Sequence, residues 1–289
     1  MKKQLFTGVC TALVTPFLED KINEPMLKVL LSRQIHAGID AVVLAGTTGE
    51  SPTLSDDEKL RLFRIAQDFV GEEMLVIAGT GSNNTRHAIE LSIEAEKIGV
   101  DALLVVSPYY NKATHSGLIA HYTAIAKAVS IPIILYNVPS RTGVDIPVSV
   151  YEELAKIPNI AGVKEASTDI GKILRIRAQC PEHFCIWSGN DNLTVPILSL
   201  GGKGVISVAS NLLPEQMNLM TFAALDGDFD TAAAIQADLL PWLDFFGCEV
   251  NPIPIKAAMA HYGLDCGNCR LPLTSLSPGN QAILEQLSS

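Results

Sequence analysis

The sequence predicts an α/β protein, a (β/α)8 TIM barrel followed by a C-terminal helical extension. Short apolar runs recur along the chain at separations of roughly 20 to 35 residues, which is the length of one βα unit. Between them lie segments in which apolar residues repeat at helical spacing. The eight runs predicted as strands are Val9–Thr15, Ala41–Gly46, Leu75–Thr80, Ala102–Ser107, Pro132–Asn137, Ile160–Ala166, Cys185–Gly189 and Gly204–Ala209.

These runs are apolar along their whole length rather than alternating. Strands of this kind belong to a parallel sheet that is covered on both faces. Eight of them joined by helices fit a closed barrel over residues 1–225, and a doubly wound sheet of two domains is the alternative. Residues 226–289 contain the helical stretches Phe229–Phe246 and Ile255–Tyr262, so we expect a helical extension packed on the barrel.

The intervening segments carry helix start and stop signals. Ser55-Asp-Asp-Glu58 has the sequence of a capping box, and apolar residues then follow at helical spacing. Pro147 suits the first position of a helix, and Gly99 suits a helix end. Strand and helix are therefore expected to alternate throughout the barrel.

The composition argues against nucleic acid and membrane as partners. With 31 acidic and 21 basic residues, the net charge of −10 opposes attraction to anionic surfaces. No apolar run approaches the roughly 20 residues that span a bilayer. The six cysteines are dispersed in mostly apolar segments, which is typical of reduced thiols in a cytoplasmic protein.

A metal site is not expected. Cys266-Gly-Asn-Cys269 is the one cysteine pair with metal or redox spacing, but no second pair or nearby pair of histidines completes a zinc site. We interpret Cys266 and Cys269 as two loop thiols. The six histidines likewise show no metal-binding spacing.

The chemistry of a TIM barrel lies at the carboxyl ends of its strands. There the sixth predicted strand carries Lys164 followed by Glu165, and adjacent strand residues point to opposite faces. A lysine inside the barrel would be a nucleophilic amine, because desolvation favours its neutral form. The alternative is that Lys164 extends to solvent at the barrel mouth or pairs with Glu165. A lysine near a predicted strand end is also not unique in this chain, because Lys112 and Lys203 lie in such positions.

Other strand ends supply hydroxyl and guanidinium groups. Tyr136 ends the fifth predicted strand, and its phenol could transfer protons or only pack. Arg141 follows in a loop, where its guanidinium could bind a carboxylate or lie in solvent. Thr47 and Thr48 lie in a turn that could hold a carboxylate through hydroxyls and backbone amides, or serve only as a βα turn.

Together these segments closely resemble the dihydrodipicolinate synthase family, which belongs to the pyruvate-dependent class I aldolases. The likeness covers essentially the whole chain and is highly specific as a set. The matching segments are Gly46-Thr-Thr-Gly-Glu50, Pro108-Tyr-Tyr-Asn111, Tyr136-Asn-Val-Pro-Ser-Arg-Thr-Gly143, Gly162-Val-Lys-Glu-Ala166, Gly204-Val-Ile-Ser207, Asn251-Pro-Ile-Pro-Ile-Lys256 and Arg270-Leu-Pro272.

The resemblance implies a Schiff base between Lys164 and pyruvate, whose enamine attacks the aldehyde of L-aspartate 4-semialdehyde. Cyclisation and loss of water then give the first committed intermediate toward diaminopimelate and lysine. Neither a metal nor an organic cofactor is implied. The family expectation is a homotetramer built as a dimer of dimers.

The resemblance also implies roles for individual residues. Thr47, Tyr136 and Tyr110 would form a proton relay, with Tyr110 entering the site of a neighbouring subunit. Thr48 would help to hold the pyruvate carboxylate, and Arg141 would bind the carboxylate of the second substrate. Backbone at Gly189 and Ile206 would line the pocket.

Regulation is where this chain departs from the family. Lysine-inhibited members bind free lysine at positions that correspond here to Ser51, Asp56, Lys59, Asn83, His87 and Tyr109. Sensitive enzymes mostly have a histidine at the position of Lys59 and a glutamate at that of His87. A positive charge here opposes the ammonium group of the effector, so we expect weak or absent inhibition by lysine.

Two alternatives to this function are kept. N-acetylneuraminate lyases and 2-keto-3-deoxy sugar acid lyases share the lysine and the tyrosine but mostly lack an arginine at the position of Arg141. A non-catalytic sensor of keto acids or amino acids is the other alternative. Such a binding protein would have no need of both an amine nucleophile and a proton relay.

Overall fold

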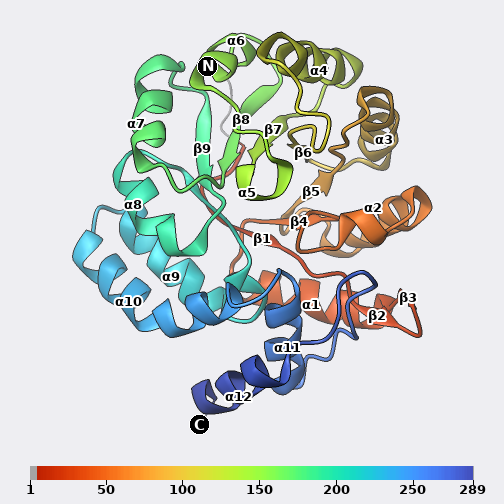
Figure 1. The fold of residues 1–289 in the computed structure, drawn as a ribbon, viewed down its shortest axis with the longest axis vertical. Helices are drawn as coiled ribbons and strands as arrows, with labels where there is room; N and C mark the ends of the chain where they lie inside the picture. The colour runs from red at the N-terminus through yellow and green to blue at the C-terminus, as the bar shows by residue number, and fades with distance from the viewer. Residues whose placement is uncertain (1–4, 289) are drawn as a thin grey trace.

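The computed structural model of the protein describes residues 5–288, and its centre is a closed barrel of eight parallel strands (Figure 1). Residues 1–4 of the predicted barrel segment and residue 289 of the predicted extension lie outside the described residues. Around the barrel the strand order is β1-β10-β9-β8-β7-β6-β5-β4. These strands are β1 (Gly8–Ala12), β4 (Ala41–Leu44), β5 (Leu75–Gly79), β6 (Ala102–Val106), β7 (Ile133–Asn137), β8 (Ile160–Glu165), β9 (Cys185–Ser188) and β10 (Gly204–Ser207).

Helices connect the strands and form the outer layer of the barrel (Figure 1). They are α1 (Glu24–His36), α2 (Asp56–Val70), α3 (Thr85–Ile98), α4 (His115–Ala128), α5 (Pro139–Thr142), α6 (Val148–Leu154), α7 (Ile170–Gln179), α8 (Thr194–Ser199) and α9 (Pro214–Leu225). Short 3-10 turns η1 (Ser51–Thr53), η2 (Asp191–Leu193) and η3 (Ala209–Asn211) follow three of the strands.

All eight predicted strands are present, and the barrel closes where β1 pairs in parallel with β10. The doubly wound alternative is therefore wrong. Closure brings the two backbones very close, because a Cβ on Gly204 would overlap the carbonyl oxygen of Gly8. Strand β7 ends at Asn137 as predicted, and the other seven strands end earlier than predicted. After β1, for example, the N–H of Val14 is bound by the side chain of Asn211 at 3.0 Å instead of by a neighbouring strand.

The core has two layers, one inside the barrel and one between the strands and the helices. Successive strand residues alternate between them: Val9 packs in the outer layer, and Cys10 packs in the inner one. Apolar side chains fill the barrel interior, and Trp187 stacks on Phe6 with ring centroids 4.9 Å apart. The interior is therefore a packed core rather than a pore.

The predicted helix signals are found at or next to helix ends. The Ser55 hydroxyl accepts the N–H of Glu58 at 3.2 Å, and the Glu58 carboxylate accepts the N–H of Ser55 at 2.9 Å, which completes the capping box of α2. Gly99 ends α3 with a φ of 94°. Pro147 is the N-cap of α6, so that helix begins one residue later than predicted.

Beyond α9 the chain forms a C-terminal helical part, α10 (Phe229–Phe246), α11 (Ile253–His261) and α12 (Pro278–Leu287). The bounds of α10 are those predicted, and α11 begins two residues earlier than predicted. In Figure 1 α11 and α12 lie in the lower part of the view, and both helices contact α10. A small hairpin of β2 (Phe17–Leu18) and β3 (Lys21–Ile22) precedes α1. Neither α12 nor this hairpin was predicted, and the two-residue strands of the hairpin are too short to show alternation.

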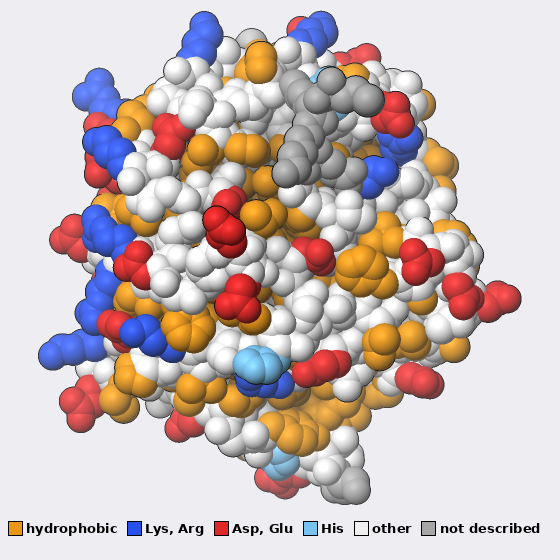
Figure 2. All heavy atoms as spheres, turned by 180° about the vertical axis from the view of Figure 1, so that it is seen from behind, with side chains coloured by type: hydrophobic (Ala, Val, Ile, Leu, Met, Phe, Trp, Pro, Cys, Tyr) orange, Lys and Arg blue, Asp and Glu red, His pale blue; other side chains and the backbone are white. Residues whose placement is uncertain are grey.

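The surface is mixed in character. On the face drawn in Figure 2, acidic side chains are spread among hydrophobic ones, and a file of basic side chains follows one edge. Within residues 5–288 we find no helix with both the length and the apolar character needed to cross a membrane. All six cysteines belong to this part of the chain, and each is a free thiol.

Candidate active site

Lys164 lies inside the barrel. It occupies the carboxyl end of β8, is only 4% exposed, and places its Nζ 4.5 Å from the centroid of the Tyr136 ring. The two residues are direct partners in the β7–β8 register. Lys112 is exposed in a loop, and Lys203 precedes β10 at the opposite end of the barrel, so neither competes for this position.

Glu165 is buried on the other face of β8, toward the helices. Its carboxylate accepts hydrogen bonds from Asn137 Nδ2 at 2.7 Å and from Tyr151 Oη at 3.0 Å, and Lys172 Nζ lies at 3.4 Å. The alternative in which Lys164 pairs with Glu165 is therefore wrong. Burial, together with the Glu165 charge, raises the pKa of the Tyr151 hydroxyl, which keeps it a donor.

The turn that carries Thr47 and Thr48 follows β4 directly. Its backbone is closed by the N–H of Glu50 on the carbonyl of Thr47 at 3.1 Å, and Glu50 itself has a φ of 56°. The buried Glu50 carboxylate accepts Lys256 Nζ from α11 at 2.6 Å and the N–H of Arg270 at 2.8 Å. The C-terminal part of the chain therefore holds this turn in place.

Arg141 lies on α5, immediately after β7. Its guanidinium is exposed and donates from Nη2 to the carbonyl oxygen of Asn251 at 3.3 Å. The side chain of the same asparagine donates from Nδ2 to the Thr48 hydroxyl at 3.0 Å. Asn251 therefore touches both residues that were predicted to bind substrate carboxylates.

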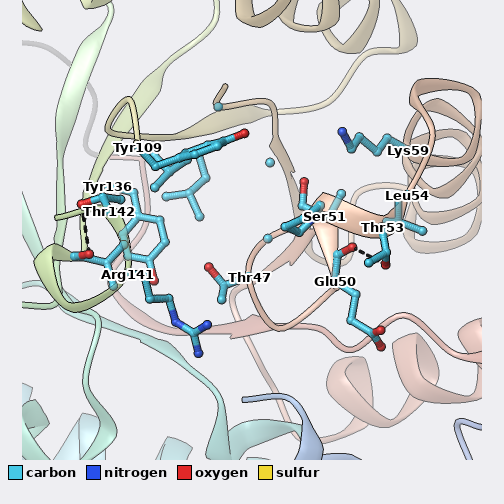
Figure 3. Close-up of a pocket in the computed structure, with 18 of the residues that line it drawn as sticks. Thr47, Glu50, Ser51, Thr53, Leu54, Lys59, Tyr109, Tyr136, Arg141 and Thr142 are labelled. Atoms are coloured by element: carbon cyan, nitrogen blue, oxygen red, sulfur yellow. Dashed lines mark hydrogen bonds between the residues drawn. The ribbon is translucent and has the colours of Figure 1, made fainter. Parts of the chain in front are cut away.

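A cavity of about 680 Å³ opens beside these groups. Figure 3 shows Tyr109, Tyr136 and Arg141 on one side of it, Ser51 and Lys59 on the other, and Thr47 between them. Lys164 and Thr48 are buried behind this lining rather than part of it. A substrate in the cavity would meet Thr47, Tyr136 and Arg141 together.

The two neighbouring tyrosines after β6 differ strongly. Tyr109 lines the cavity, whereas Tyr110 is 91% exposed and has a φ of 71°. Left-handed backbone is uncommon for a bulky residue. The described chain alone therefore does not bring Tyr110 to Lys164.

The two predicted backbone positions are Gly189, directly after β9, and Ile206, on the neighbouring strand β10. The N–H of Gly189 donates to the carbonyl oxygen of Glu165 at 2.8 Å, which places Gly189 at the same end of the barrel as Lys164. Ile206 lies on β10 with its side chain buried in the barrel interior.

Five of the six predicted effector positions line the same cavity. Ser51, Asp56, Lys59, His87 and Tyr109 line it, whereas Asn83 lies outside the lining and its carbonyl accepts Asn111 Nδ2 at 2.9 Å. Asp56 already has two cationic or basic neighbours, Lys59 Nζ at 3.4 Å and His87 Nε2 at 2.7 Å. Partial burial opposes ionisation of Asp56, but the hydrogen bond and charge of His87 and the charge of Lys59 lower its pKa.

Metal binding finds no support in the described part of the chain, where no group of three or more His, Cys, Asp or Glu side chains could hold an ion. Burial raises the pKa of Cys266 to about 12 and that of Cys269 to about 11, so both thiols stay protonated at neutral pH. The contacts of Asn251 and Lys256 were not predicted. In the sequence, the signal for these two residues is the Asn251–Lys256 segment of the family resemblance.

Known proteins are similar to this chain over nearly its whole length. A family model described as "Dihydrodipicolinate synthetase family" matches residues 5–288. The curated "4-hydroxy-tetrahydrodipicolinate synthase" of Acetivibrio thermocellus is 45% identical over 287 residues, which cover 99% of this chain and 97% of that protein.

Solved structures agree as well. Dihydrodipicolinate synthase from Acinetobacter baumannii, described as chloride inhibited and complexed with pyruvate, has a TM-score of 0.95 and 38% identity, with 97% of each chain covered. The Cyanidioschyzon merolae enzyme with lysine bound has a TM-score of 0.95 and 40% identity, over 98% of this chain and 97% of that one.

Proposed function

Because the chain belongs to the dihydrodipicolinate synthetase family, we propose that it condenses pyruvate with L-aspartate 4-semialdehyde. The products are 4-hydroxy-tetrahydrodipicolinate and water, which makes the enzyme a lyase of the class I aldolase type in diaminopimelate and lysine biosynthesis. The observation that carries the proposal is the buried Lys164 amine, 4.5 Å from the Tyr136 ring on the adjacent strand. The near full-length relatives named as synthases favour this reaction over the sugar-acid lyases.

The reaction begins at Lys164. Its neutral amine attacks C2 of pyruvate, and loss of water from the carbinolamine leaves a Schiff base. Loss of a C3 proton gives an enamine, which forms a carbon–carbon bond to the aldehyde carbon of the second substrate. The amino group of that substrate then attacks C2, closes the ring and releases the free amine of Lys164.

Proton transfers in these steps are assigned to hydroxyl groups. Tyr136 lies against Lys164, and Thr47 lines the same cavity, so both can exchange protons with groups bound there. We assign the third hydroxyl of the proton relay to Tyr110 of a neighbouring subunit. Its 91% exposure and its left-handed backbone support this role, because a partner would cover the ring.

Assembly and location follow as proposals from the same reasoning. We place the protein in the cytoplasm as a homotetramer built from two dimers, in which each dimer pairs two active sites through Tyr110. Its six free cysteines suit a reducing compartment. Sedimentation of the purified protein tests the assembly, and a stable, fully active monomer would contradict it.

The two carboxylates of the substrates are assigned to different groups. The Thr48 hydroxyl and the backbone amides of its turn bind the pyruvate carboxylate, with the backbone at Gly189 and Ile206 lining the pocket. The exposed guanidinium of Arg141 binds the carboxylate of the semialdehyde.

Inhibition by lysine is proposed to be weak or absent. An effector ammonium needs a carboxylate partner, and the two carboxylates in the cavity lining are Glu50 and Asp56. Glu50 is bound by Lys256, and Asp56 is approached by Lys59 and His87. A second ammonium at Asp56 would lie near the charge of Lys59.

The test of the function is borohydride reduction in the presence of pyruvate, followed by peptide mass mapping. We expect a pyruvate-derived adduct on Lys164, whereas a keto-acid sensor would give none. Comparison of the semialdehyde with sugar aldehydes as acceptors then separates the synthase from the sugar-acid lyases. Absence of the adduct in the active, folded protein would rule out the Schiff-base mechanism.

A further inference from the structure

Asn251, in the loop before α11, joins the two loops that bind the substrates. Its Nδ2 donates to the hydroxyl of Thr48, 203 positions away, and its carbonyl accepts the guanidinium of Arg141, 110 positions away. The residue itself lines the cavity. The effect of Asn251 on each loop depends on which atom donates and which accepts in these two hydrogen bonds.

The hydrogen bond to Thr48 has a direction. A threonine hydroxyl carries one proton and two lone pairs, and here a lone pair is occupied by the amide N–H of Asn251. The amide oxygen of Asn251 is buried and has no partner within residues 5–288. Because Nδ2 is the atom that meets Thr48, the hydroxyl of Thr48 is the acceptor in this contact, and its proton has no acceptor among residues 5–288.

A free hydroxyl proton matters because an ionised carboxylate can only accept hydrogen bonds. We propose that Asn251 is a positioning residue that keeps the Thr48 hydroxyl a donor toward the carboxylate of pyruvate. The inference rests on the proposed function, since it takes pyruvate as the ligand of Thr48. The side chain of Asn251 thereby serves pyruvate, and its backbone carbonyl serves Arg141 and the second substrate.

A second contact between the same two segments distinguishes this positioning role from a purely structural one. Lys256, five residues after Asn251, binds Glu50, two residues after Thr48, through a buried ion pair of 2.6 Å. The turn therefore keeps its place when the Asn251 side chain is shortened. Substitution at Asn251 changes the hydrogen bonding of Thr48 rather than the position of the turn.

The test measures the pyruvate concentration that gives half-maximal borohydride trapping on Lys164, in the absence of the second substrate. We expect Asn251→Ala to raise it about 10-fold, as for loss of one hydrogen bond to a charged group. Asn251→Asp is nearly isosteric, but a carboxylate can only accept hydrogen bonds. It therefore accepts the hydrogen bond that the Thr48 hydroxyl would otherwise donate to pyruvate, and it adds a negative charge. Its half-saturating concentration should rise about 100-fold or more.

Two further measurements make the result specific. In a Thr48→Val background the hydroxyl is gone, so adding Asn251→Ala should change pyruvate trapping no further. The KM for the semialdehyde should stay unchanged in Asn251→Ala, because the backbone carbonyl that binds Arg141 remains. A purely structural role would instead damage the use of both substrates.

The matched control is Asn218→Asp on α9, where the asparagine donates to the carbonyl of Ala37 at 3.0 Å, away from the cavity. It should keep the wild-type response to pyruvate, and thermal unfolding identifies any variant that fails to fold. If Asn251→Ala and Asn251→Asp both trap pyruvate like the wild type, the inference is overturned while the Schiff-base function stands. If the wild-type protein itself forms no adduct, both are overturned.

Discussion

The substitution Lys256→Met tests how strongly the C-terminal part of the chain stabilises the substrate-binding turn. Lys256 and Glu50 form an ion pair of 2.6 Å whose side chains are 4% and 0% exposed. Methionine keeps most of the apolar volume of lysine but leaves the buried Glu50 carboxylate without its ammonium partner, with the Arg270 N–H and the Cys269 thiol still bound to it. Breaking a buried pair from one side costs about 3 to 5 kcal/mol, because an uncompensated charge remains.

The assay is urea-induced unfolding at pH 7, with the free energy of unfolding compared among four proteins. The wild type and Lys256→Met should differ by about 3 to 5 kcal/mol. The double variant Glu50→Gln/Lys256→Met should recover much of the difference, since glutamine carries no charge and still accepts the Arg270 N–H. The control Lys97→Met removes an ion pair whose side chains are 65% and 47% exposed, and it should cost at most about 1 kcal/mol.

A Lys256→Met variant no less stable than Lys97→Met would refute a stabilising role for the buried ion pair. A double variant as unstable as Lys256→Met alone would refute the cost assigned to the Glu50 charge. In that case the loss would come from the packing of Lys256 on the Phe17 ring, which lies 4.5 Å from its Nζ, and not from the stranded carboxylate.

Four further outcomes are expected. Tyr136→Phe should lower kcat by roughly 10²- to 10⁴-fold with unchanged thermal stability, because only the hydroxyl is lost; turnover close to wild type would remove Tyr136 from the relay. Arg141→Ala should raise the KM for the semialdehyde roughly 10- to 100-fold while pyruvate trapping stays normal, and an unchanged KM would contradict the assigned contact. In steady-state assays lysine should inhibit weakly or not at all, and half-inhibition below millimolar lysine would disprove this. Finally, the hydrogen bond from Arg270 lowers the pKa of Glu58 below its ordinary 4.5. The pair therefore stabilises the folded protein above that pH, and stabilises it progressively less as the pH falls through the folded-state pKa. Glu58→Gln should flatten this part of the plot of unfolding free energy against pH, and an unchanged plot would count against the pair.

Local patterns were sufficient to predict the elements of the barrel. Continuous apolar runs identified all eight strands, and the capping box at Ser55 marked the start of α2. These signals act over one strand or one helical turn, so they can be recognised in the sequence without knowing which segments pack against each other. Strand ends were less well predicted, because contacts such as Val14 with Asn211 decide where pairing stops.

The placement of Lys164 shows the limit of such patterns. Alternation along β8 required Lys164 and Glu165 to face opposite sides, but period-two geometry does not say which side is the interior. The closed barrel decides it, because Tyr151 and Lys172 on the outer helices supply the partners of Glu165. The lysine is left inside, next to Tyr136.

The candidate site as a whole combines both levels. Residue types at strand ends, together with the family resemblance, named Thr47, Tyr136, Lys164 and Arg141 from the sequence alone. Only the tertiary structure joined Asn251 to Thr48 and Lys256 to Glu50, across 203 and 206 positions of the chain. No local spacing encodes such contacts, because they arise when the barrel has closed and the C-terminal helices pack against its mouth.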